Sequence, residues 1–300
     1  MHSILNLLPE HVEAYVRDMM VKDESIEEIR LRIHQPIECL FANDAQFSSI
    51  RFTEQDANFF LNQLSEYSLY AFEEELQKGY ITIEGGHRVG LAGKTILDQG
   101  RVKSIRPIRS FNIRVAKQKL GVSDKLVPEL YDSKTGWRNT LIVGAPQTGK
   151  TTLLRDLARN ISAGSKRIPA SKVAIVDERS EIAGCMNGVP QHELGTRADV
   201  LDGCPKAEGM MMMIRSMSPQ VMIVDEVGRE EDAYAILEAR HAGVVLMATA
   251  HGRSFEEVYK RPIFKQLLNE QAFDRVVEVG RTPYPGAINK IRIPTLVKPS

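Results

Sequence analysis

The sequence is poor in the features that mark several protein classes. It holds three cysteines in 300 residues, Cys39, Cys185 and Cys204, and none of them forms a C-x-x-C pair. An odd number of thiols without that spacing argues against a disulfide framework and against a cysteine zinc site. We therefore expect reduced thiols in a cytosolic setting, buried and chemically inert.

Net charge and long apolar runs are lacking as well. The chain has 39 basic and 39 acidic residues, so no overall charge favours nucleic acid or an anionic membrane as the main partner. No apolar stretch approaches the roughly 20 residues of a membrane-spanning helix, and acidic residues near the start argue against a cleavable signal. No internal repeat is found either, which argues against a solenoid. We expect a soluble protein that would need a partner to reach a membrane.

What the sequence does contain is a complete phosphate-loop motif, G-x-x-x-x-G-K-[ST]. It follows the apolar run 140–143 and precedes the helix-like segment 152–158, which is the strand, loop and helix order that phosphate binding requires. The residues expected to contact the nucleotide are Gly144, Ala145, Pro146, Gln147, Thr148, Gly149, Lys150, Thr151 and Thr152.

Each part of this motif has a chemical role. The glycines let successive amide hydrogens point at phosphate oxygens, and the helix that follows presents its positive end to the same anion. Lys150 reaches the β- and γ-phosphates, while the Thr151 hydroxyl is suited to bind Mg²⁺. The motif predicts a seat for ATP with Mg²⁺, rather than a general anion site.

Three more apolar runs end in polar residues. Residues 173–176 precede Asp177 and Glu178, residues 221–224 precede Asp225 and Glu226, and residues 244–250 precede His251. Unbroken apolar runs are typical of parallel strands that helices cover on both faces. The carboxyl ends of parallel strands lie on one edge of a sheet, where open α/β sheets bind ligands. We therefore expect all three ends to meet at the nucleotide.

The pair Asp225 and Glu226 is the second strong signal. Two adjacent carboxylates after an apolar strand allow one to reach the Mg²⁺ shell and its neighbour to orient and deprotonate the attacking water. We assign Asp225 to the metal and Glu226 to the general base. An acidic strand end that caps the next helix is the structural alternative. His251 has two interpretations as well, a donor to a phosphate oxygen or a structural histidine.

The N-terminal part differs from the rest. Apolar residues from Ile4 to Met19 recur at helical spacing, residues 29–33 and 37–41 suggest two strands, and residues 53–64 suggest a capped helix. A helical segment at 69–76, a hairpin at 80–92 and a strand at 111–115 follow. The predicted fold class is α/β, a RecA-like P-loop core at 139–300 preceded by a small α+β domain at 1–118, with a linker at 119–138 whose lysines, glycines and prolines dilute the apolar pattern.

Several segments resemble a known superfamily. The run Met213 to Arg229 and the run Ala248-Thr249-Ala250-His251-Gly252 are similar to the Walker B and His-box regions of secretion-superfamily ATPases, the hexameric motors of type II and type IV secretion and of type IV pili. Residues 176–184, 104–108 and 112–116 resemble, more closely, the stage III sporulation protein AA family of endospore-forming bacteria. That resemblance extends over residues 1–300.

The resemblance implies roles that the pattern alone does not supply. Asp177, Glu178 and Glu181 would form an acidic box near the γ-phosphate, with Asp177 at the metal and Glu178 in catalysis, and His251 would sense the γ-phosphate. The motors carry Glu before Asp-Pro where this chain has Asp177-Glu178-Arg179, so the division of roles within the box stays open. The arginines that would complete the site of a neighbouring subunit are Arg88, Arg106, Arg109 and Arg114, with Arg215 and Arg229 as further candidates.

The sequence thus predicts an ATPase that works in a ring, expected to be a hexamer. The resemblance implies a membrane-embedded partner in the sporulation channel complex, engaged from the mother-cell cytoplasm or peripherally at the membrane. Two alternatives stay open. A nucleic-acid translocase disagrees with the neutral net charge, so no nucleic-acid partner is expected. A nucleotide-gated scaffold without turnover disagrees with the intact Asp225 and Glu226 pair.

Overall fold

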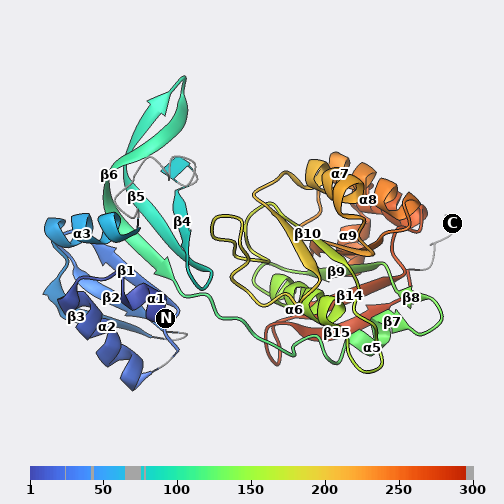
Figure 1. The fold of residues 1–300 in the computed structure, drawn as a ribbon, viewed down its shortest axis with the longest axis horizontal. Helices are drawn as coiled ribbons and strands as arrows, with labels where there is room; N and C mark the ends of the chain where they lie inside the picture. The colour runs from blue at the N-terminus through green and yellow to red at the C-terminus, as the bar shows by residue number, and fades with distance from the viewer. Residues whose placement is uncertain (24, 42–43, 65–75, 78, 295–300) are drawn as a thin grey trace. The chain divides into compact units, whose positions relative to one another are not determined.

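The chain folds into two structural units. The computed structural model describes residues 1–23, 25–41, 44–64, 76–77 and 79–294. Contacts within the chain separate Met1–Lys117 from Gln118–Ser300 (Figure 1). Each unit has its own buried apolar core, as expected for segments of this length.

The first unit is an antiparallel sheet of six strands with helices packed on it. The strand order is β3-β2-β1-β6-β5-β4. The elements are α1 (His2–Leu5), α2 (Glu10–Lys22), β1 (Glu28–Arg32), β2 (Pro36–Leu40), β3 (Ala45–Arg51), α3 (Glu54–Leu64), β4 (Tyr80–Ile83), β5 (His87–Asp98) and β6 (Arg101–Arg114). Alternate residues of β1 and β2 are buried, because one face of the sheet packs on the helices and the other does not.

Most elements predicted for this unit are present, but its first helix and its third strand differ from the prediction. The expected first helix is two helices, because Pro9 cannot continue α1 and instead precedes α2. Strand β3 was not expected, since only one of its seven residues is buried and its sequence lacks a clear apolar alternation. The helix expected at 69–76 lies, apart from Leu76, outside the described residues.

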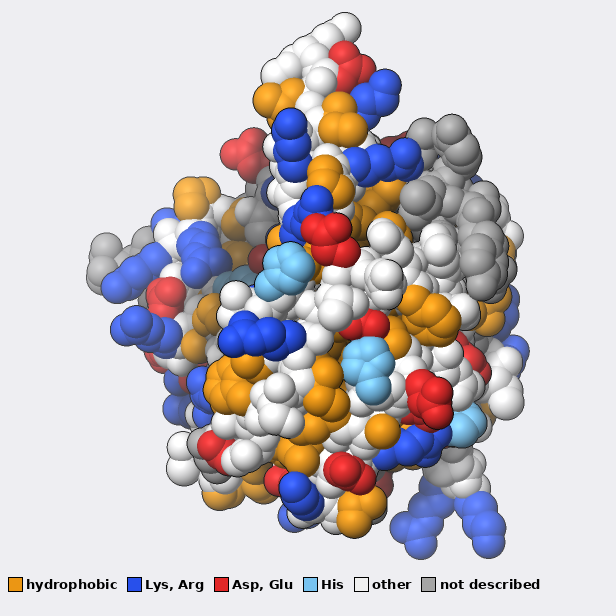
Figure 2. Space-filling model, turned by 90° about the vertical axis from the view of Figure 1, so that its left-hand side faces the viewer, with side chains coloured by type: hydrophobic (Ala, Val, Ile, Leu, Met, Phe, Trp, Pro, Cys, Tyr) orange, Lys and Arg blue, Asp and Glu red, His pale blue; other side chains and the backbone are white. Residues whose placement is uncertain are grey.

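Strands β5 and β6 extend well beyond the rest of the sheet. Strand β4 pairs with residues 87–90 and β1 with residues 110–114, whereas the hairpin between Gly93 and Ile108 pairs only with itself among the described strands. This arm exposes Ile96, Leu97 and Val102 together with cationic side chains. It is the narrow projection at the top of Figure 2.

The second unit is built on a sheet of seven strands in the order β11-β10-β12-β13-β9-β14-β15. Every neighbouring pair is parallel except β14 with β15. The strands are β9 (Thr140–Gly144), β10 (Val173–Asp177), β11 (Ala198–Asp202), β12 (Val221–Val224), β13 (Val245–His251), β14 (Arg275–Gly280) and β15 (Ala287–Arg292). The four apolar runs of the sequence are thus the parallel strands β9, β10, β12 and β13.

Helices cover both faces of this sheet. They are α5 (Val127–Leu130), α6 (Lys150–Ala163), α7 (Lys206–Met217), α8 (Glu230–His241), α9 (Phe255–Tyr259) and α10 (Pro262–Asn269). Side chains of α6 share a core with Ile142 and Ile175, whereas those of α7, α8 and α10 share another with Leu141 and Val176. Neighbouring residues of one strand point to opposite faces, so the two cores are separated by the sheet. This explains why the strands are apolar without interruption.

The segment expected to be a linker, 119–138, belongs to the second unit. It contains α5 and a short hairpin of β7 (Tyr131–Asp132) and β8 (Gly136–Trp137), and its Leu126, Leu130 and Trp137 are buried in the core that includes α6. Asp156 of α6 accepts hydrogen bonds from the segment's Ser123 amide and hydroxyl, at 2.8 and 2.7 Å. A few apolar residues are enough to anchor this segment, because they pack in the same core as helix α6.

Within the part of the chain that the structure describes, no helix combines the length and the apolar character needed to cross a bilayer. The three thiols are unpaired, with Cys39 and Cys185 buried and Cys204 half-buried. Burial raises the pKa of Cys39 and of Cys185 to about 12, so both remain protonated and unreactive at neutral pH.

Candidate functional site

The phosphate loop lies between β9 and α6, as the motif predicts. Gly149 has a left-handed φ of 83°, and a Cβ there would stand 2.8 Å from the Gly286 nitrogen. The same Gly286 amide donates to the Thr148 carbonyl at 2.7 Å. The turn between β14 and β15 therefore packs directly on the phosphate loop, and a larger residue than glycine at position 149 would push the two apart.

A pocket of about 430 Å³ opens beside this loop. Its residues come from the loop and the start of α6, from the ends of β12 and β13, from the segment after β10 and from the turn between β14 and β15. They are Pro146, Gln147, Thr148, Gly149, Lys150, Thr151, Thr152, Arg179, Glu181, Asp225, Glu226, His251 and Pro285. The predicted convergence of strand ends is thus found for β9, β12 and β13. Gly144 ends β9, and the Ala145 carbonyl faces inward to accept from Lys150 and Thr148.

Lys150 and Thr151 each contact a partner within the pocket. The Lys150 ammonium donates to the Ala145 carbonyl at 2.9 Å and lies 3.2 Å from Nδ1 of His251. Burial lowers the Lys150 pKa, while the carboxylates of Asp225 and Glu226 act in the opposite direction. The Thr151 hydroxyl donates to Oδ2 of Asp225 at 2.7 Å. A hydroxyl and a carboxylate oxygen are thus held together beside the phosphate loop.

Thr249 of β13 links the two acidic residues that follow β12. Its buried hydroxyl is hydrogen-bonded to Oδ1 of Asp225, and it accepts the amide hydrogen of Glu226 at 2.8 Å. Glu226 has a left-handed φ of 53°, a conformation that costs free energy for a residue with a Cβ. The bond to Thr249 helps to hold it. Thr249 was not predicted, although it is a hydroxyl inside an otherwise apolar strand.

The Glu226 carboxylate has a basic partner on each oxygen. Oε1 lies 3.2 Å from Nε2 of His251, and Oε2 lies 3.1 Å from a guanidinium nitrogen of Arg179. An ammonium can only donate, so Nδ1 of His251 accepts from Lys150 and the proton sits on Nε2, where it is donated to Glu226. One chain of contacts therefore runs from the phosphate loop through Lys150 and His251 to Glu226 and Arg179. Arg179 was not among the predicted site residues.

Asp177 has a different role from the one expected. It is almost fully buried, and its carboxylate accepts the backbone amides of Glu181, Ile182 and Ala183 at 2.8 to 2.9 Å. Burial raises its pKa to about 6 against the opposing effect of these amides. A carboxylate turned into the backbone in this way organises the loop that follows β10, so we do not retain Asp177 as a magnesium ligand.

Glu178 is likewise engaged outside the pocket. Its carboxylate pairs with Lys206 of α7 and lies 3.9 Å from a guanidinium nitrogen of Arg229. Burial favours the neutral acid, but the hydrogen bond from Lys206 and the neighbouring cations outweigh it and lower the Glu178 pKa. Of the expected acidic box, Glu181 is the member that lines the pocket. The catalytic role expected for Glu178 has no support in these contacts.

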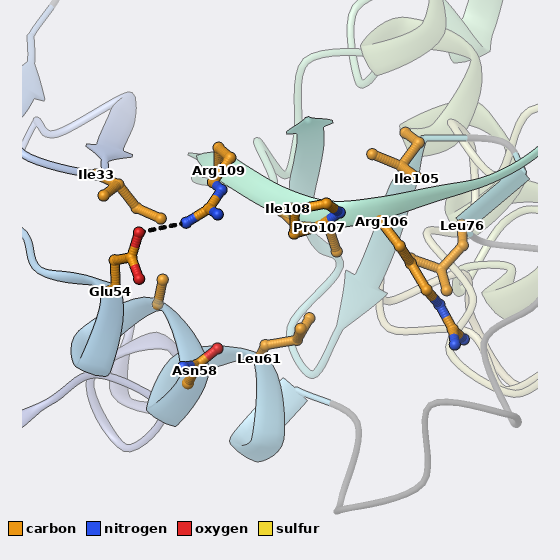
Figure 3. Close-up of a pocket in the computed structure, with 11 residues that line it drawn as sticks. Ile33, Glu54, Asn58, Leu61, Leu76, Ile105, Arg106, Pro107, Ile108 and Arg109 are labelled. Atoms are coloured by element: carbon orange, nitrogen blue, oxygen red, sulfur yellow. Dashed lines mark hydrogen bonds and ion pairs between the residues drawn. The ribbon is translucent and has the colours of Figure 1, made fainter. Parts of the chain in front are cut away.

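The N-terminal arginines lie in the first unit. Arg106 and Arg109 line a separate pocket of about 370 Å³ between α3 and β6 (Figure 3). A guanidinium nitrogen of Arg109 lies 2.7 Å from a carboxylate oxygen of Glu54. Arg106 points away from Glu54, into the part of the view in which Leu76 is labelled. Arg88 lies over the Tyr80 ring, and Arg114 is exposed at the end of β6. Their expected action on a nucleotide stays a prediction.

Comparisons with known proteins agree with this architecture. The family described as "Sporulation stage III, protein AA" matches residues 1–293. Stage III sporulation protein AA of Bacillus subtilis (strain 168) is 54% identical over 292 residues, which is 97% of this chain and 94% of that protein. Protein SEEDLING PLASTID DEVELOPMENT 1 of Arabidopsis thaliana is 33% identical over 135 residues, 44% of this chain and 19% of that protein.

Two solved structures share the fold. The pilus retraction motor PilT, solved with ADP, has a TM-score of 0.61 at 14% identity and is covered to 83%, with 93% of this chain aligned. The Legionella pneumophila ATPase DotB has a TM-score of 0.59 at 17% identity, with 88% of this chain and 75% of DotB aligned. These likenesses confirm the predicted fold, a RecA-like α/β domain preceded by an N-terminal domain. The family model that matches residues 1–293, together with the relative that is 54% identical over 97% of this chain, shows that the chain belongs to the stage III sporulation protein AA family.

Proposed function

We propose that this protein hydrolyses ATP and acts as the motor of a secretion-like complex during endospore formation. One observation carries the proposal: the phosphate-loop residues Lys150 and Thr151 share a pocket with Asp225, Glu226 and His251, and Thr151 contacts Asp225 at 2.7 Å. Three separate segments supply these groups, and each group has a use in transferring a γ-phosphoryl group to water.

The residues in the pocket fit Mg²⁺. The Thr151 hydroxyl and the Asp225 carboxylate are hard oxygen donors, and Mg²⁺ prefers one or two such protein ligands with water and phosphate in the remaining positions. In the described residues no cluster of three His, Cys, Asp or Glu side chains could hold a metal by itself, which agrees with a metal brought in with its nucleotide. When bound, Mg²⁺ would neutralise part of the charge on the β- and γ-phosphates.

Glu226 is the candidate base. Its strained backbone, bonded to Thr249, directs the carboxylate into the pocket, where His251 donates to one oxygen. Lys150 is ready to exchange the Ala145 carbonyl for phosphate oxygens, which accept stronger, charge-assisted hydrogen bonds. In this proposal His251 links Lys150 to Glu226, so a change at the phosphate is passed to the base.

A ring, expected to be a hexamer, is the proposed working assembly. Family membership and the fold shared with PilT and DotB support it, and in such a ring Arg106, Arg109 or Arg114 would reach the site of the adjacent subunit. The proposed partner is a membrane-embedded sporulation complex engaged from the mother-cell cytoplasm. We expect no nucleic-acid partner, because the chain carries no net charge.

Turnover measurements on two variants test the enzymatic step. We expect Glu226→Gln to bind ATP while losing hydrolysis by about 10²- to 10⁴-fold, the usual contribution of a general base. Lys150→Ala should lose nucleotide affinity itself. Arg167→Ala, in an exposed loop after α6, is the matched control and should hydrolyse ATP like the parent. Binding without turnover in the parent protein would instead favour a nucleotide-gated scaffold.

The partner is tested by capture of the Glu226→Gln variant from sporulating cells in the presence of ATP, with identification of what is retained. Polytopic membrane proteins held only with ATP would support the motor assignment. Retained nucleic acid would replace it with a translocase.

A further inference from the structure

Among the described residues, two cationic side chains line the nucleotide pocket, Lys150 and Arg179. Lys150 belongs to the phosphate-loop motif, whereas Arg179 follows the Asp177-Glu178 pair at the end of β10. Strand β10 neighbours β12 in the sheet, and its carboxyl end therefore lies beside Asp225 and Glu226. Arg179 contacts Oε2 of Glu226 at 3.1 Å, while 63% of its side chain is exposed.

The loop that carries Arg179 is held firmly on both sides. Asp177 accepts three amides from residues 181–183, and Ser180, which has a left-handed φ of 52°, bonds Asp202 through its hydroxyl. From the other side, Arg155 of α6 donates to the carbonyls of Ile182 and Glu181 at 2.6 and 2.5 Å. Helix α6 begins at Lys150, so the phosphate loop and the Arg179 loop are joined through a few strong bonds.

The partners of Arg179 can be exchanged. The pair joins a largely exposed guanidinium to a carboxylate whose side chain is 35% exposed, so water competes for both charges and weakens the pair. The terminal phosphate of a bound triphosphate carries more charge than a carboxylate and accepts paired hydrogen bonds from the planar guanidinium. A phosphate placed in the pocket would therefore compete successfully with Glu226 for Arg179.

We propose that Arg179 binds the terminal phosphate of ATP within its own subunit, and that Glu226 holds Arg179 in the nucleotide-free protein. The inference rests on the proposed function for the identity of the ligand. In this proposal Arg179 is a cation of the same subunit that distinguishes ATP from ADP. When ATP binds, Arg179 moves to the phosphate, and Glu226 loses one of its two partners. The base is thereby freed only when a γ-phosphate is present.

The test compares the affinities of the full-length protein for ADP and for the non-hydrolysable β,γ-imido analogue of ATP, both with Mg²⁺, by calorimetry. Arg179→Ala should weaken analogue binding by about 10- to 100-fold, the range for a lost hydrogen bond to a charged group, and should leave ADP affinity within about twofold of the parent. Arg179→Lys should recover part of the loss, because it restores charge without the planar fork. Arg167→Ala is the control for removing an exposed arginine.

Three results would overturn the inference. Equal weakening of both nucleotides would mean that Arg179 acts on a group that they share. Unchanged affinity of Arg179→Ala for both nucleotides would mean that Arg179 pairs with Glu226 and does not contact the nucleotide. Absence of nucleotide binding in the parent protein would overturn this inference and the proposed function together. Discrimination that depends on Arg179 in a protein without turnover would remove the ATPase proposal and leave Arg179 as a triphosphate sensor.

Discussion

At the residue scale, a buried threonine organises the two carboxylates on which the proposed chemistry depends. Thr249 contacts Asp225 through its hydroxyl and accepts the Glu226 amide, although 23 or more residues separate it from both along the chain. We expect Thr249→Val, which keeps the shape of the side chain, to lower the free energy of unfolding by about 1 to 3 kcal/mol. Asp225 loses the hydroxyl that donates to it, and the Glu226 amide is left with the longer contact to Oδ1 of Asp225, at 3.0 Å.

Urea unfolding of the Thr249→Val and Thr249→Ser variants measures this effect. The serine variant keeps the hydroxyl and should unfold close to the parent. Hydrolysis should fall in the valine variant as well, because Glu226 loses the bond that holds its strained backbone. Equal stability of the valine variant and the parent would show that Thr249 is dispensable.

Asp177 provides a pH-dependent prediction. Its pKa is raised from 3.8 to about 6 in the folded protein, so between those values the folded state binds a proton more tightly than the unfolded chain. The free energy of unfolding contributed by Asp177 should therefore fall as pH rises from about 4 to about 6, by at most a few kcal/mol, and stay level above that.

Asp177→Asn removes the titrating group and is therefore the reference protein. It also lowers the stability of the loop by an amount that does not depend on pH, because an acceptor oxygen is replaced by a donor nitrogen. Urea unfolding of both proteins at several pH values should show the parent losing stability relative to the variant across this window. Parallel curves would mean that the backbone amides cancel the effect of burial, so that the Asp177 pKa is the same in the folded and unfolded states.

At the scale of elements, helix α7 depends on a close approach to β10. Gly209 lies in the helix interior, and a Cβ there would stand 2.6 Å from Cγ1 of Val176. Replacing an interior helical glycine with alanine ordinarily stabilises a helix by about 1 kcal/mol. Here we expect the opposite sign, a loss of about 1 to 3 kcal/mol from overpacking.

Thermal or urea unfolding of Gly209→Ala checks the sign. Met212→Ala, at an exposed position of the same helix, is the control and should change stability little. A stabilised Gly209→Ala variant would show that the helix can move away from the sheet without cost.

Elements could be predicted where the local pattern is strong. Strands β9, β10, β12 and β13 are buried on both faces and therefore read as unbroken apolar runs. Strand β11 was missed because it is an edge strand whose residues are mostly half-exposed. The arm between Gly93 and Ile108 was missed in the same way, since exposed strands need no apolar pattern.

At the scale of the whole molecule, the proposed ring predicts that subunits share active sites. If Arg106 of one subunit completes the site of the next, Arg106→Ala and Lys150→Ala proteins should each be inactive alone. When the two variants are mixed in equal amounts and reassembled, they should recover about a quarter of the parent turnover. A site is complete only where a subunit that keeps Lys150 meets a neighbour that keeps Arg106, which is one of four equally frequent pairings.

The measurement is the rate of ATP hydrolysis by the mixture, compared with the rate of each variant alone. The same mixture made with Arg109→Ala or Arg114→Ala ranks the other arginines. Absence of recovery with all three arginine variants would favour a site whose catalytic groups come from one subunit, in which Arg179 and Lys150 are the cations that line the described pocket.

The sequence by itself determined the phosphate loop, the acidic strand ends, the two-part organisation and the family resemblance, because each of these is written in neighbouring residues. Tertiary structure alone decided that Arg179 and Pro285 line the pocket and that Thr249 bonds Asp225 and Glu226. It also decided that Asp177 accepts amides of its own loop and that the expected linker packs on α6. The reason is physical: burial and hydrogen bonding depend on which distant segments the sheet brings together, and a side chain's neighbours across strands leave no trace in the local pattern.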